Sequence, residues 1–262
     1  MASDDFSLAV MSRVEDAGLN ASAPPQQRWL DGWLLRYLPG KARRARCINA
    51  LAPGLLPLAD KLALAEPVFA EAGLPMIFRL TRFTQPPRLD DELQRLGFAL
   101  VDPTLVMIRP DLADLAATPA RSLPAGTRWT ALDGVAYAEA VGALRGSPAE
   151  HRRSHALRLQ HSPVPYQGFA IVRQDDATVL ACGQFAREGE LVGLYDVFTH
   201  EQARGQGLAG LLCERMLSIS GRQRAKVAYL QVDGANHPAL AVYRRLGFAA
   251  GYGYHYRERQ DG

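Results

Sequence analysis

The chain has few of the features that mark a membrane, secreted or nucleic-acid-binding protein. No uncharged apolar run approaches the roughly 18 residues that a membrane span requires, and residues 1–5 (MASDD) are acidic where a secretory signal needs Lys or Arg. The 30 Lys and Arg against 27 Asp and Glu give a net charge of only +3, too thin an excess for a broad basic surface. These absences predict a cytoplasmic protein that binds neither nucleic acid nor membranes.

Cysteine is scarce as well. Cys47, Cys182 and Cys213 are odd in number and far apart, which argues against a disulfide framework and a zinc knuckle. We expect all three in hydrophobic cores. His151 and His155 stand four positions apart in residues 148–160, which we expect to form an exposed polar helix. Because the sequence offers no third ligand nearby, we predict no metal site there.

What is present is the patterning of an α/β (α+β) protein in two parts. Residues 109–127 are rich in Pro, Ala and Ser and lack sustained periodicity, so they separate two halves of the chain. We predict an N-terminal domain over residues 1–112, a linker over 113–126 and a C-terminal domain over 127–262. In the C-terminal domain short turns indicate an antiparallel meander, and the expected order is strands at 168–173, 178–187 and 190–199, a helix from 208, a strand at 226–232, a helix at 237–246 and a strand from 248.

An internal repeat links the halves. The pentapeptide Arg-Leu-Gly-Phe-Ala occurs at residues 95–99 and again 150 positions later, at residues 245–249. The first half also shows the order of elements that the second half shows from its third strand onward, with a strand at 44–51, a helix at 57–72, a strand at 76–82, a helix at 89–96 and a strand from 98. We infer two copies of one unit.

A glycine-rich segment between a strand and an amphipathic helix carries the main chemical signal. Residues 202–210 (QARGQGLAG) contain Gly205, Gly207 and Gly210 at the spacing of a dinucleotide fingerprint, and Asp233 stands 23 positions after Gly210. Only 52 residues follow Gly210, too few for the remaining strands and crossovers of a doubly wound sheet. The alternative is a loop whose glycines let the backbone curl around a pyrophosphate at the N-terminus of the next helix.

Two motifs in this half resemble those of the GNAT superfamily of N-acetyltransferases. The segment Gln202-x-x-Gly205-x-Gly207 resembles its acyl-coenzyme A loop, and residues 236–248 (NHPALAVYRRLGF) resemble its closing signature of Asn, Ala, Tyr and Gly-Phe. The resemblance covers roughly residues 126–258. It implies two GNAT-like units, each a mixed, largely antiparallel twisted sheet flanked by helices, with acetyl-CoA as co-substrate between two strands that splay apart beside the glycine loop.

The resemblance also implies where acetyl-CoA binds. One strand would pair its backbone with the pantetheine arm, the loop would hold the pyrophosphate, and residues 148–160 would line the acceptor side. The expected cofactor-binding residues are Val197, Phe198, Thr199, Gln202, Arg204, Gly205, Gln206, Gly207, Leu208, Ala209 and Asn236.

The family's usual chemistry, direct attack of an amine on the thioester, needs a proton donor for the leaving thiolate and a base for the amine. Tyr243 matches the family's general acid, and its phenol can protonate a thiolate if packing holds it within reach. No carboxylate matches the base unambiguously. Asp196 is the first candidate, because apolar Val192, Leu194 and Phe198 on its expected strand face would raise its pKa. Glu190 and His200 are alternatives.

The first half has lost these groups at the offset of 150. Leu93, Pro86, Leu55 and Pro57 stand where the second half has Tyr243, Asn236, Gly205 and Gly207. This half then resembles the inactive repeat of tandem GNAT proteins, a degenerate unit kept for its shape. Its basic residues Lys41, Arg43, Arg44 and Arg46 are expected to form a solvated face beside a strand, or else to contact an acidic acceptor or the other domain.

The prediction is therefore an N-acetyltransferase that moves an acetyl group from acetyl-CoA to a primary amine, with the amine on a small molecule or on a protein. A non-catalytic acyl-CoA binding or sensing module is the alternative. We expect a monomer or a homodimer.

Overall fold

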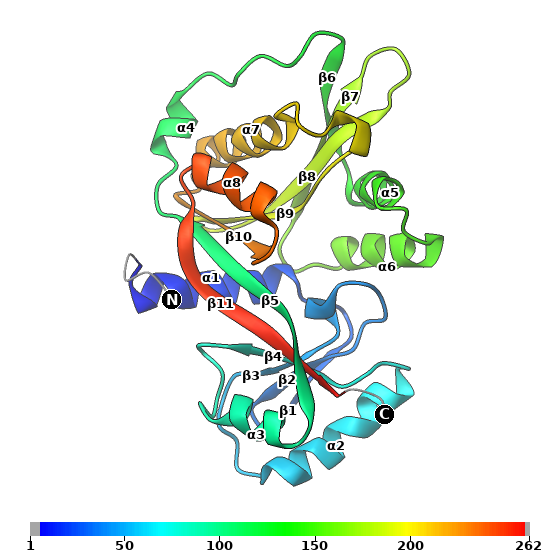
Figure 1. The fold of residues 1–262 in the computed structure, drawn as a ribbon, viewed down its shortest axis with the longest axis vertical. Coiled ribbons are helices and arrows are strands. Elements are labelled where there is room, and N and C mark those ends of the chain that lie inside the picture. The colour runs from blue at the N-terminus through cyan, green and yellow to red at the C-terminus, as the bar shows by residue number, and fades with distance from the viewer. Residues whose placement is uncertain (1–5, 260–262) are drawn as a thin grey trace.

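The computed structural model describes residues 6–259, and the chain forms two halves that share one sheet (Figure 1). The first half contains α1 (Leu8–Ala21), β1 (Gln27–Leu30), β2 (Trp33–Arg36), η1 (Arg43–Ala45), β3 (Ile48–Ala50), α2 (Leu58–Glu71), β4 (Ile77–Thr81), α3 (Leu89–Arg95) and β5 (Phe98–Arg109). After α4 (Ala113–Ala117), the second half contains β6 (Thr127–Leu132), α5 (Gly134–Leu144), α6 (Ala149–Gln160), β7 (Tyr166–Arg173), β8 (Val179–Glu188), β9 (Leu191–Thr199), η2 (Glu201–Ala203), α7 (Leu208–Arg222), β10 (Val227–Asp233), α8 (His237–Arg245) and β11 (Ala249–Arg259).

Local sequence fixes the ends of the helices that matter for the site. The Asn236 side chain caps α8 by accepting a hydrogen bond from the Ala239 amide at 3.2 Å, and Pro238 occupies the first turn, where a missing N–H costs little. The repeated pentapeptide ends α3 and α8 in the same way. Gly97 (φ 84°) and Gly247 (φ 80°) both adopt the left-handed conformation, so each stops its helix and starts the following strand.

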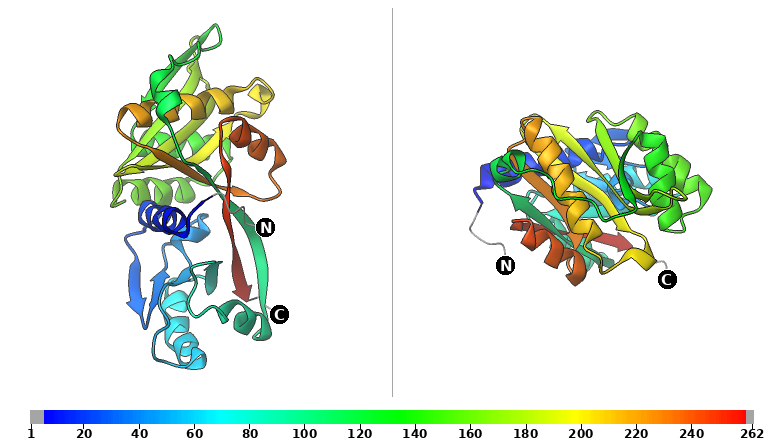
Figure 2. Two further views of the ribbon diagram at one scale, coloured as in Figure 1. Left: turned by 90° about the vertical axis from the view of Figure 1, so that its left-hand side faces the viewer. Right: turned by 90° about the horizontal axis from the view of Figure 1, so that it is seen from above.

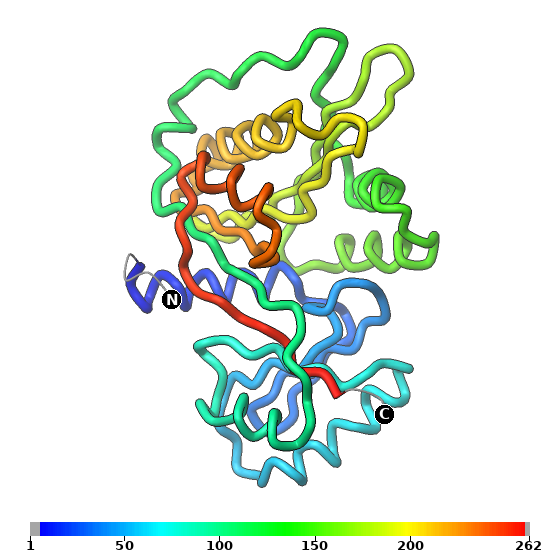
Figure 3. Tube along the Cα trace, viewed as in Figure 1, coloured from blue at the N-terminus to red at the C-terminus, as the bar shows by residue number. Residues whose placement is uncertain are grey.

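The halves exchange their last strands. The strand order of the eleven-stranded sheet is β1-β2-β3-β4-β11-β5-β10-β9-β8-β7-β6. The last strand of the second half, β11, pairs antiparallel with β4, and the last strand of the first half, β5, pairs antiparallel with β10. Both long strands therefore run side by side from one half to the other (Figure 3). The expected mixed, largely antiparallel sheet flanked by helices is confirmed, and the two units build it jointly.

The pairing of β5 with β11 is symmetric about the repeat. Thr104 pairs with Tyr254, the residue 150 positions later, so this pair lies on a local twofold axis. The pairs Met107–Ala250 and Leu100–Arg257 are related to each other by the same offset. Duplication of one unit explains this register, because each copy of the strand meets the other antiparallel.

Helices cover both faces of the second half. Because side chains alternate along a strand, Phe169 and Ile171 of β7 pack toward α7, whereas Ala170 and Val172 pack toward α5. Helix α1 lies between the two halves (Figure 2), where Met11 and Val14 pack in one core with side chains of β4, β5, β10 and β11. The three cysteines are buried and free, as expected.

The structure corrects the sequence prediction in the first half. Residues 44–51 do not form one strand: η1 takes up the basic segment and only Ile48–Ala50 is extended. The segment is also not a solvated face. Arg43 forms ion pairs with Asp102 of β5 and Glu258 of β11, and Arg44 donates to Gln231 of β10 at 2.6 Å. Arg43 and Arg44 therefore contact the second half, in line with the alternative expectation of contacts to the other domain, while Lys41 is exposed.

Candidate active site

Strands β9 and β10 start side by side and then part. Their parallel pairing begins with Val227 opposite Leu191 and ends with Leu230 opposite Leu194, although β9 continues to Thr199 and β10 to Asp233. The backbone of residues 195–199 therefore has no strand partner on the side of β10 within the described chain. Val197, Phe198 and Thr199, the residues expected to meet the pantetheine arm, lie on this stretch.

A bulge in β9 turns the strand at the same place. The register with β8 shifts between Gln184 opposite Tyr195 and Cys182 opposite Phe198, and Asp196 has a left-handed φ of 51°. The bulge changes which way the side chains face. Leu194 packs toward α7, whereas Phe198 packs in the core beside α5. Asp196 therefore does not share a face with Val192 and Leu194, contrary to the prediction.

Asp196 is surrounded by cationic and amide groups. Arg145 donates to Oδ1 and Gln184 to Oδ2, each at 3.1 Å, while His155 Nε2 lies 3.4 Å and Arg158 Nη2 3.9 Å from Oδ2. Burial alone would raise the pKa of Asp196, but the His155 contact and the charges of Arg145 and Arg158 bring this pKa well below its ordinary value. The predicted rise in pKa is wrong, because the prediction counted apolar neighbours and no cations.

The glycine loop opens into the first turn of α7. Gly205 (φ 78°) and Gly207 (φ 74°) both adopt the left-handed conformation, and a side-chain carbon at either position would meet no atom within 4 Å. The first amides of a helix have no intrahelical acceptor, and Leu211 is the first residue of α7 whose amide bonds back into the loop, at 3.1 Å to the Gly207 carbonyl. The loop backbone and helix start therefore form an open cradle suited to an anion.

The other loop residues lie around this cradle. Arg204 is exposed, forms no ion pair among the described residues, and places its guanidinium 5.9 Å from the Phe198 ring. Gln202 and Gln206 are exposed, Leu208 is buried under the helix, and Ala209 is half-buried. Asn236 lies at the start of α8, where its side-chain oxygen caps that helix.

Tyr243 lies on the apolar side of α8. Its ring makes an edge-on contact with Phe248 and packs against the core beneath α7. Burial and, to a smaller degree, the nearby Cys213 thiol raise the pKa of Tyr243 above that of a free phenol. Its hydroxyl has no hydrogen-bond partner among the described residues, so the phenol is protonated and free to donate.

The alternative bases lie in other settings. Glu190, at the opposite end of β9 from the bulge, is paired with Lys226 at 2.6 Å, and this contact lowers its pKa. His200 accepts a hydrogen bond from the Gln202 amide through Nδ1 at 3.2 Å and so caps η2. Neither residue lines a cavity with Asp196.

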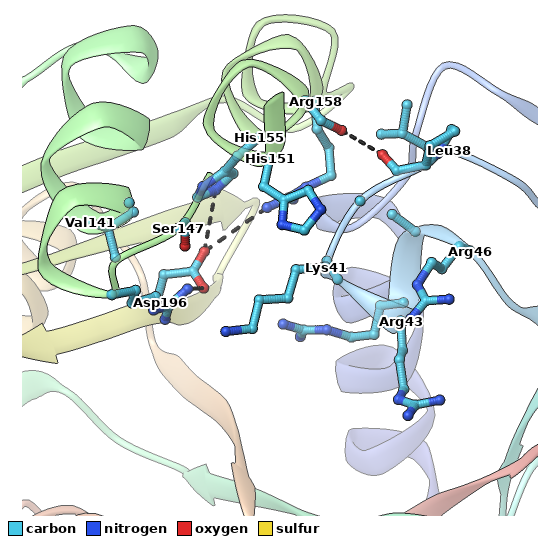
Figure 4. Close-up of a pocket in the computed structure, with 18 of the residues that line it drawn as sticks. Leu38, Lys41, Arg43, Arg46, Val141, Ser147, His151, His155, Arg158 and Asp196 are labelled. Atoms are coloured by element: carbon cyan, nitrogen blue, oxygen red, sulfur yellow. Dashed lines mark hydrogen bonds and ion pairs between the residues drawn. The ribbon is translucent and has the colours of Figure 1, made fainter. Parts of the chain in front are cut away.

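A pocket of about 690 Å³ lies beside Asp196, between the two halves (Figure 4). The second half contributes α5, α6 and the β9 bulge, and the first half contributes residues 38–46 of the connection between β2 and β3. Ser154 of α6 bonds to this connection by donating to the Pro39 carbonyl at 2.6 Å. Tyr243 does not line the pocket.

Sequence reasoning missed several of the residues in this pocket. Arg145 is the C-cap residue of α5, a helix that the sequence analysis does not predict. His155 enters that analysis only as a metal ligand or as part of an exposed polar helix. No motif or spacing in the sequence indicates that Arg145 and His155 lie close to Asp196. The polar segment 148–160 was nevertheless expected on the acceptor side, and His151, Arg152 and His155 of this segment do line the pocket.

No set of three His, Cys, Asp or Glu side chains within residues 6–259 is arranged to hold a metal ion. In the same residues, every helix is too short or too polar to cross a membrane.

A parted pair of parallel strands, a bulge in one of them and a glycine-rich cradle at the next helix are the arrangement that the resemblance to GNAT proteins implies. Residues 123–248 match the family model described as acetyltransferase (GNAT) family. Residues 123–248 therefore form a domain of the acetyltransferase (GNAT) family.

Relatives extend the likeness to both halves. An uncharacterized N-acetyltransferase of Bacillus subtilis, YobR, is 23% identical over 231 residues, which cover 88% of this chain and 91% of the relative. A GCN5-related N-acetyltransferase from Kribbella flavida has a TM-score of 0.67 at 17% identity, with 98% of each chain covered. A tandem GNAT protein from the clavulanic acid biosynthesis pathway has a TM-score of 0.62 at 16% identity over 78% of this chain and 70% of its own.

Proposed function

We propose that the second half transfers an acetyl group from acetyl-CoA to a primary amine by direct attack of the amine. The main support is that β9 parts from β10 beside Gly205 and Gly207. This places an unpaired strand edge next to an open anion cradle. The proposal treats residues 127–262 as the catalytic unit and residues 1–112 as a degenerate one, joined by residues 113–126.

The residues around the parted strands fit acetyl-CoA. The backbone of Val197, Phe198 and Thr199 offers donors and acceptors to the two amides of the pantetheine arm. The amides from Gly205 to Ala209, with Arg204 beside them, offer donors to the pyrophosphate. Acetyl-CoA brings the activated acetyl group as a thioester, and the residues bind and orient it.

Tyr243 is proposed as the general acid. Because burial raises its pKa, the phenol keeps its proton at neutral pH and can donate a hydrogen bond to the sulfur as the C–S bond breaks and negative charge develops there. The sulfur leaves as the thiol with this proton, and Tyr243 takes a proton back from solvent. The hydroxyl has no competing partner among the described residues, so the departing sulfur is free to accept its hydrogen bond.

Asp196 and His155 are proposed to handle the amine proton together. A carboxylate with so low a pKa is a poor proton acceptor at neutral pH. The imidazole of His155 lines the pocket 3.4 Å from Asp196, and the carboxylate orients it. In this proposal Asp196, the first candidate for the base, acts through His155, which takes the proton from the incoming ammonium.

The test is calorimetric titration with acetyl-CoA, followed by an assay of CoA release with a panel of amines. Gly207→Glu, which puts a negative charge in the cradle, should abolish binding, while the exposed Arg153→Gln on α6 should leave it unchanged. Amine-dependent release of CoA establishes the transferase. Binding without release supports the sensing module, and binding of a nicotinamide cofactor instead of acetyl-CoA overturns the assignment of the loop.

A further inference from the structure

The pocket between the halves is strongly basic, although the chain as a whole is nearly neutral. Seven Lys or Arg side chains line it against three Asp, while the net charge of the entire chain is +3. The lysine and arginines are Lys41, Arg43, Arg44, Arg46, Arg145, Arg152 and Arg158.

Four of these cations already have carboxylate partners. Arg43 is paired with Asp102 and Glu258, and Arg152 with Glu139 at 2.9 Å. Arg145 and Arg158 share Asp196 with His155. The third lining carboxylate, Asp233, accepts a hydrogen bond from the Ala235 amide. Each of the three lining carboxylates therefore already has an ion-pair or hydrogen-bond partner.

The three remaining cations all come from the connection between β2 and β3. Lys41, Arg44 and Arg46 form no ion pair within residues 6–259. Arg46 has a buried Nε without a hydrogen-bond partner, and burying such a donor is costly. Arg44 is held in place by its hydrogen bond to Gln231 and by the Tyr195 ring, 5.5 Å from its guanidinium carbon. Lys41 is exposed at the mouth, and Figure 4 shows it on the side of the pocket that faces Asp196 and His155.

We propose that the acceptor amine carries an oxyanion, a carboxylate or a phosphate, which Lys41, Arg44 and Arg46 bind while the amine lies at His155 and Asp196. This inference rests on the proposed function and names its substrate class. Planar guanidinium groups suit oxyanions. In this pocket the three cations come from the first half, whereas Asp196 at the β9 bulge comes from the second half. The degenerate half would thus select the substrate.

The same charge favours the reactive form of the amine. Neighbouring cations disfavour a bound ammonium relative to the neutral amine, and only the neutral amine attacks a carbonyl carbon. An amine without an anionic group would meet this repulsion with no compensating contact. In an oxyanion-bearing amine, attraction between the oxyanion and the cations offsets the repulsion of the ammonium.

The first experiment measures anion binding without any reaction. Inorganic phosphate and succinate are titrated calorimetrically into the Gly207→Glu protein, in which the cofactor cradle no longer offers a competing anion site. Each of Lys41→Gln and Arg46→Gln should weaken binding by about tenfold, the size of one charge-assisted hydrogen bond. Arg153→Gln removes one charge from α6 outside the pocket and should have no effect.

The second experiment compares matched amines. Tyrosine against tyramine and lysine against cadaverine test a carboxylate, and phosphoethanolamine against ethanolamine tests a phosphate. The anionic member of at least one pair should have the higher kcat/KM by about tenfold, mainly through KM, and Arg46→Gln should reduce that preference by raising the KM of the anionic member.

The outcomes separate the two proposals. Equal effects of Arg46→Gln and Arg153→Gln on anion binding, or a preference for the neutral amines, overturn the oxyanion inference while leaving the transferase standing. Anion binding that depends on Lys41 and Arg46 without turnover of any amine overturns the transferase and the acceptor role, and keeps the anion site. The preferred pair decides between carboxylate and phosphate.

Discussion

His155 Nε2 of α6 lies 3.4 Å from Asp196 Oδ2 at the bulge of β9. The contact joins α6, on the proposed acceptor side, to β9, which lies along the proposed path of the pantetheine arm. Arg145 donates a hydrogen bond to Oδ1 and Gln184 donates one to Oδ2, and together these bonds fix the orientation of the Asp196 carboxylate. A carboxylate held in this way positions its neighbours better than it accepts protons.

His155 is the proposed proton acceptor, so the acidic limb of the pH profile of kcat/KM should depend on this residue. His155→Gln should abolish that limb and lower kcat by about a hundredfold. Asp196→Asn should lower kcat but keep a limb, since the imidazole remains. A limb that disappears with Asp196→Asn and survives in His155→Gln would restore Asp196 as the base.

Tyr243→Phe should lower kcat by about tenfold or more with little change in the Kd for acetyl-CoA. The hydroxyl bonds to no described residue, so its removal leaves no protein group unpaired, and the ring keeps its contact with Phe248. The melting temperature should therefore hardly change. Turnover equal to that of the unchanged protein would show that Tyr243 is only a core residue.

Two glycines of the loop should respond differently to alanine. Gly207 has a left-handed φ of 74°, so Gly207→Ala should cost about 1 to 2 kcal/mol of stability. Gly210 lies in the ordinary helical conformation with only Val242 nearby, at 3.8 Å, so Gly210→Ala should be neutral or stabilising by up to about 1 kcal/mol.

Acetyl-CoA titration of both variants adds a second measurement. Binding should weaken in Gly207→Ala, because the strained turn no longer presents its amides, and should persist in Gly210→Ala. The dinucleotide fingerprint requires its third glycine for close packing of helix and strand. Loss of binding in Gly210→Ala would therefore argue for that fingerprint.

The elements around the cradle could be predicted from sequence because local chemistry marks their ends. Asn236 and Gly247 bound α8, and Gly207 precedes α7, so both helices begin where expected. Helix α1 escaped prediction because its buried side includes Glu15 and Gly18, which interrupt an apolar stripe.

The shape of the site could not be predicted in the same way. The pentapeptides at 95–99 and 245–249 are identical, so local sequence cannot decide whether β5 pairs with β4 or with β10, and the exchange is settled by packing across the halves. The side chains around Asp196 come from the C-cap of α5, from α6 and from β8, far apart in the chain, and their charges reverse the pKa shift that strand neighbours alone suggest.

A buried ion pair at the junction of the halves should make stability depend on pH. Glu15 of α1 binds Arg79 of β4 and accepts a hydrogen bond from the Tyr252 hydroxyl of β11 at 2.7 Å. Burial alone would raise the pKa of Glu15, but Arg79 and the hydrogen bonds lower it below 4.5. Because the pKa is lower in the folded protein, this carboxylate stabilises the fold fully above about pH 4.5, and the contribution is lost as the pH falls through the folded-state value.

Glu15→Gln should therefore reduce the free energy of unfolding by about 3 to 5 kcal/mol at neutral pH, since it leaves Arg79 buried without its counter-charge. The loss should shrink toward acid pH, where the unchanged protein also lacks the charge. Glu66→Gln is the matched control, because Glu66 is exposed and 3.8 Å from Arg259, a surface pair worth at most about 1 kcal/mol. Urea unfolding of the three proteins across this pH range measures both effects, and parallel curves for Glu15→Gln and the unchanged protein would show that the pair does not control acid stability.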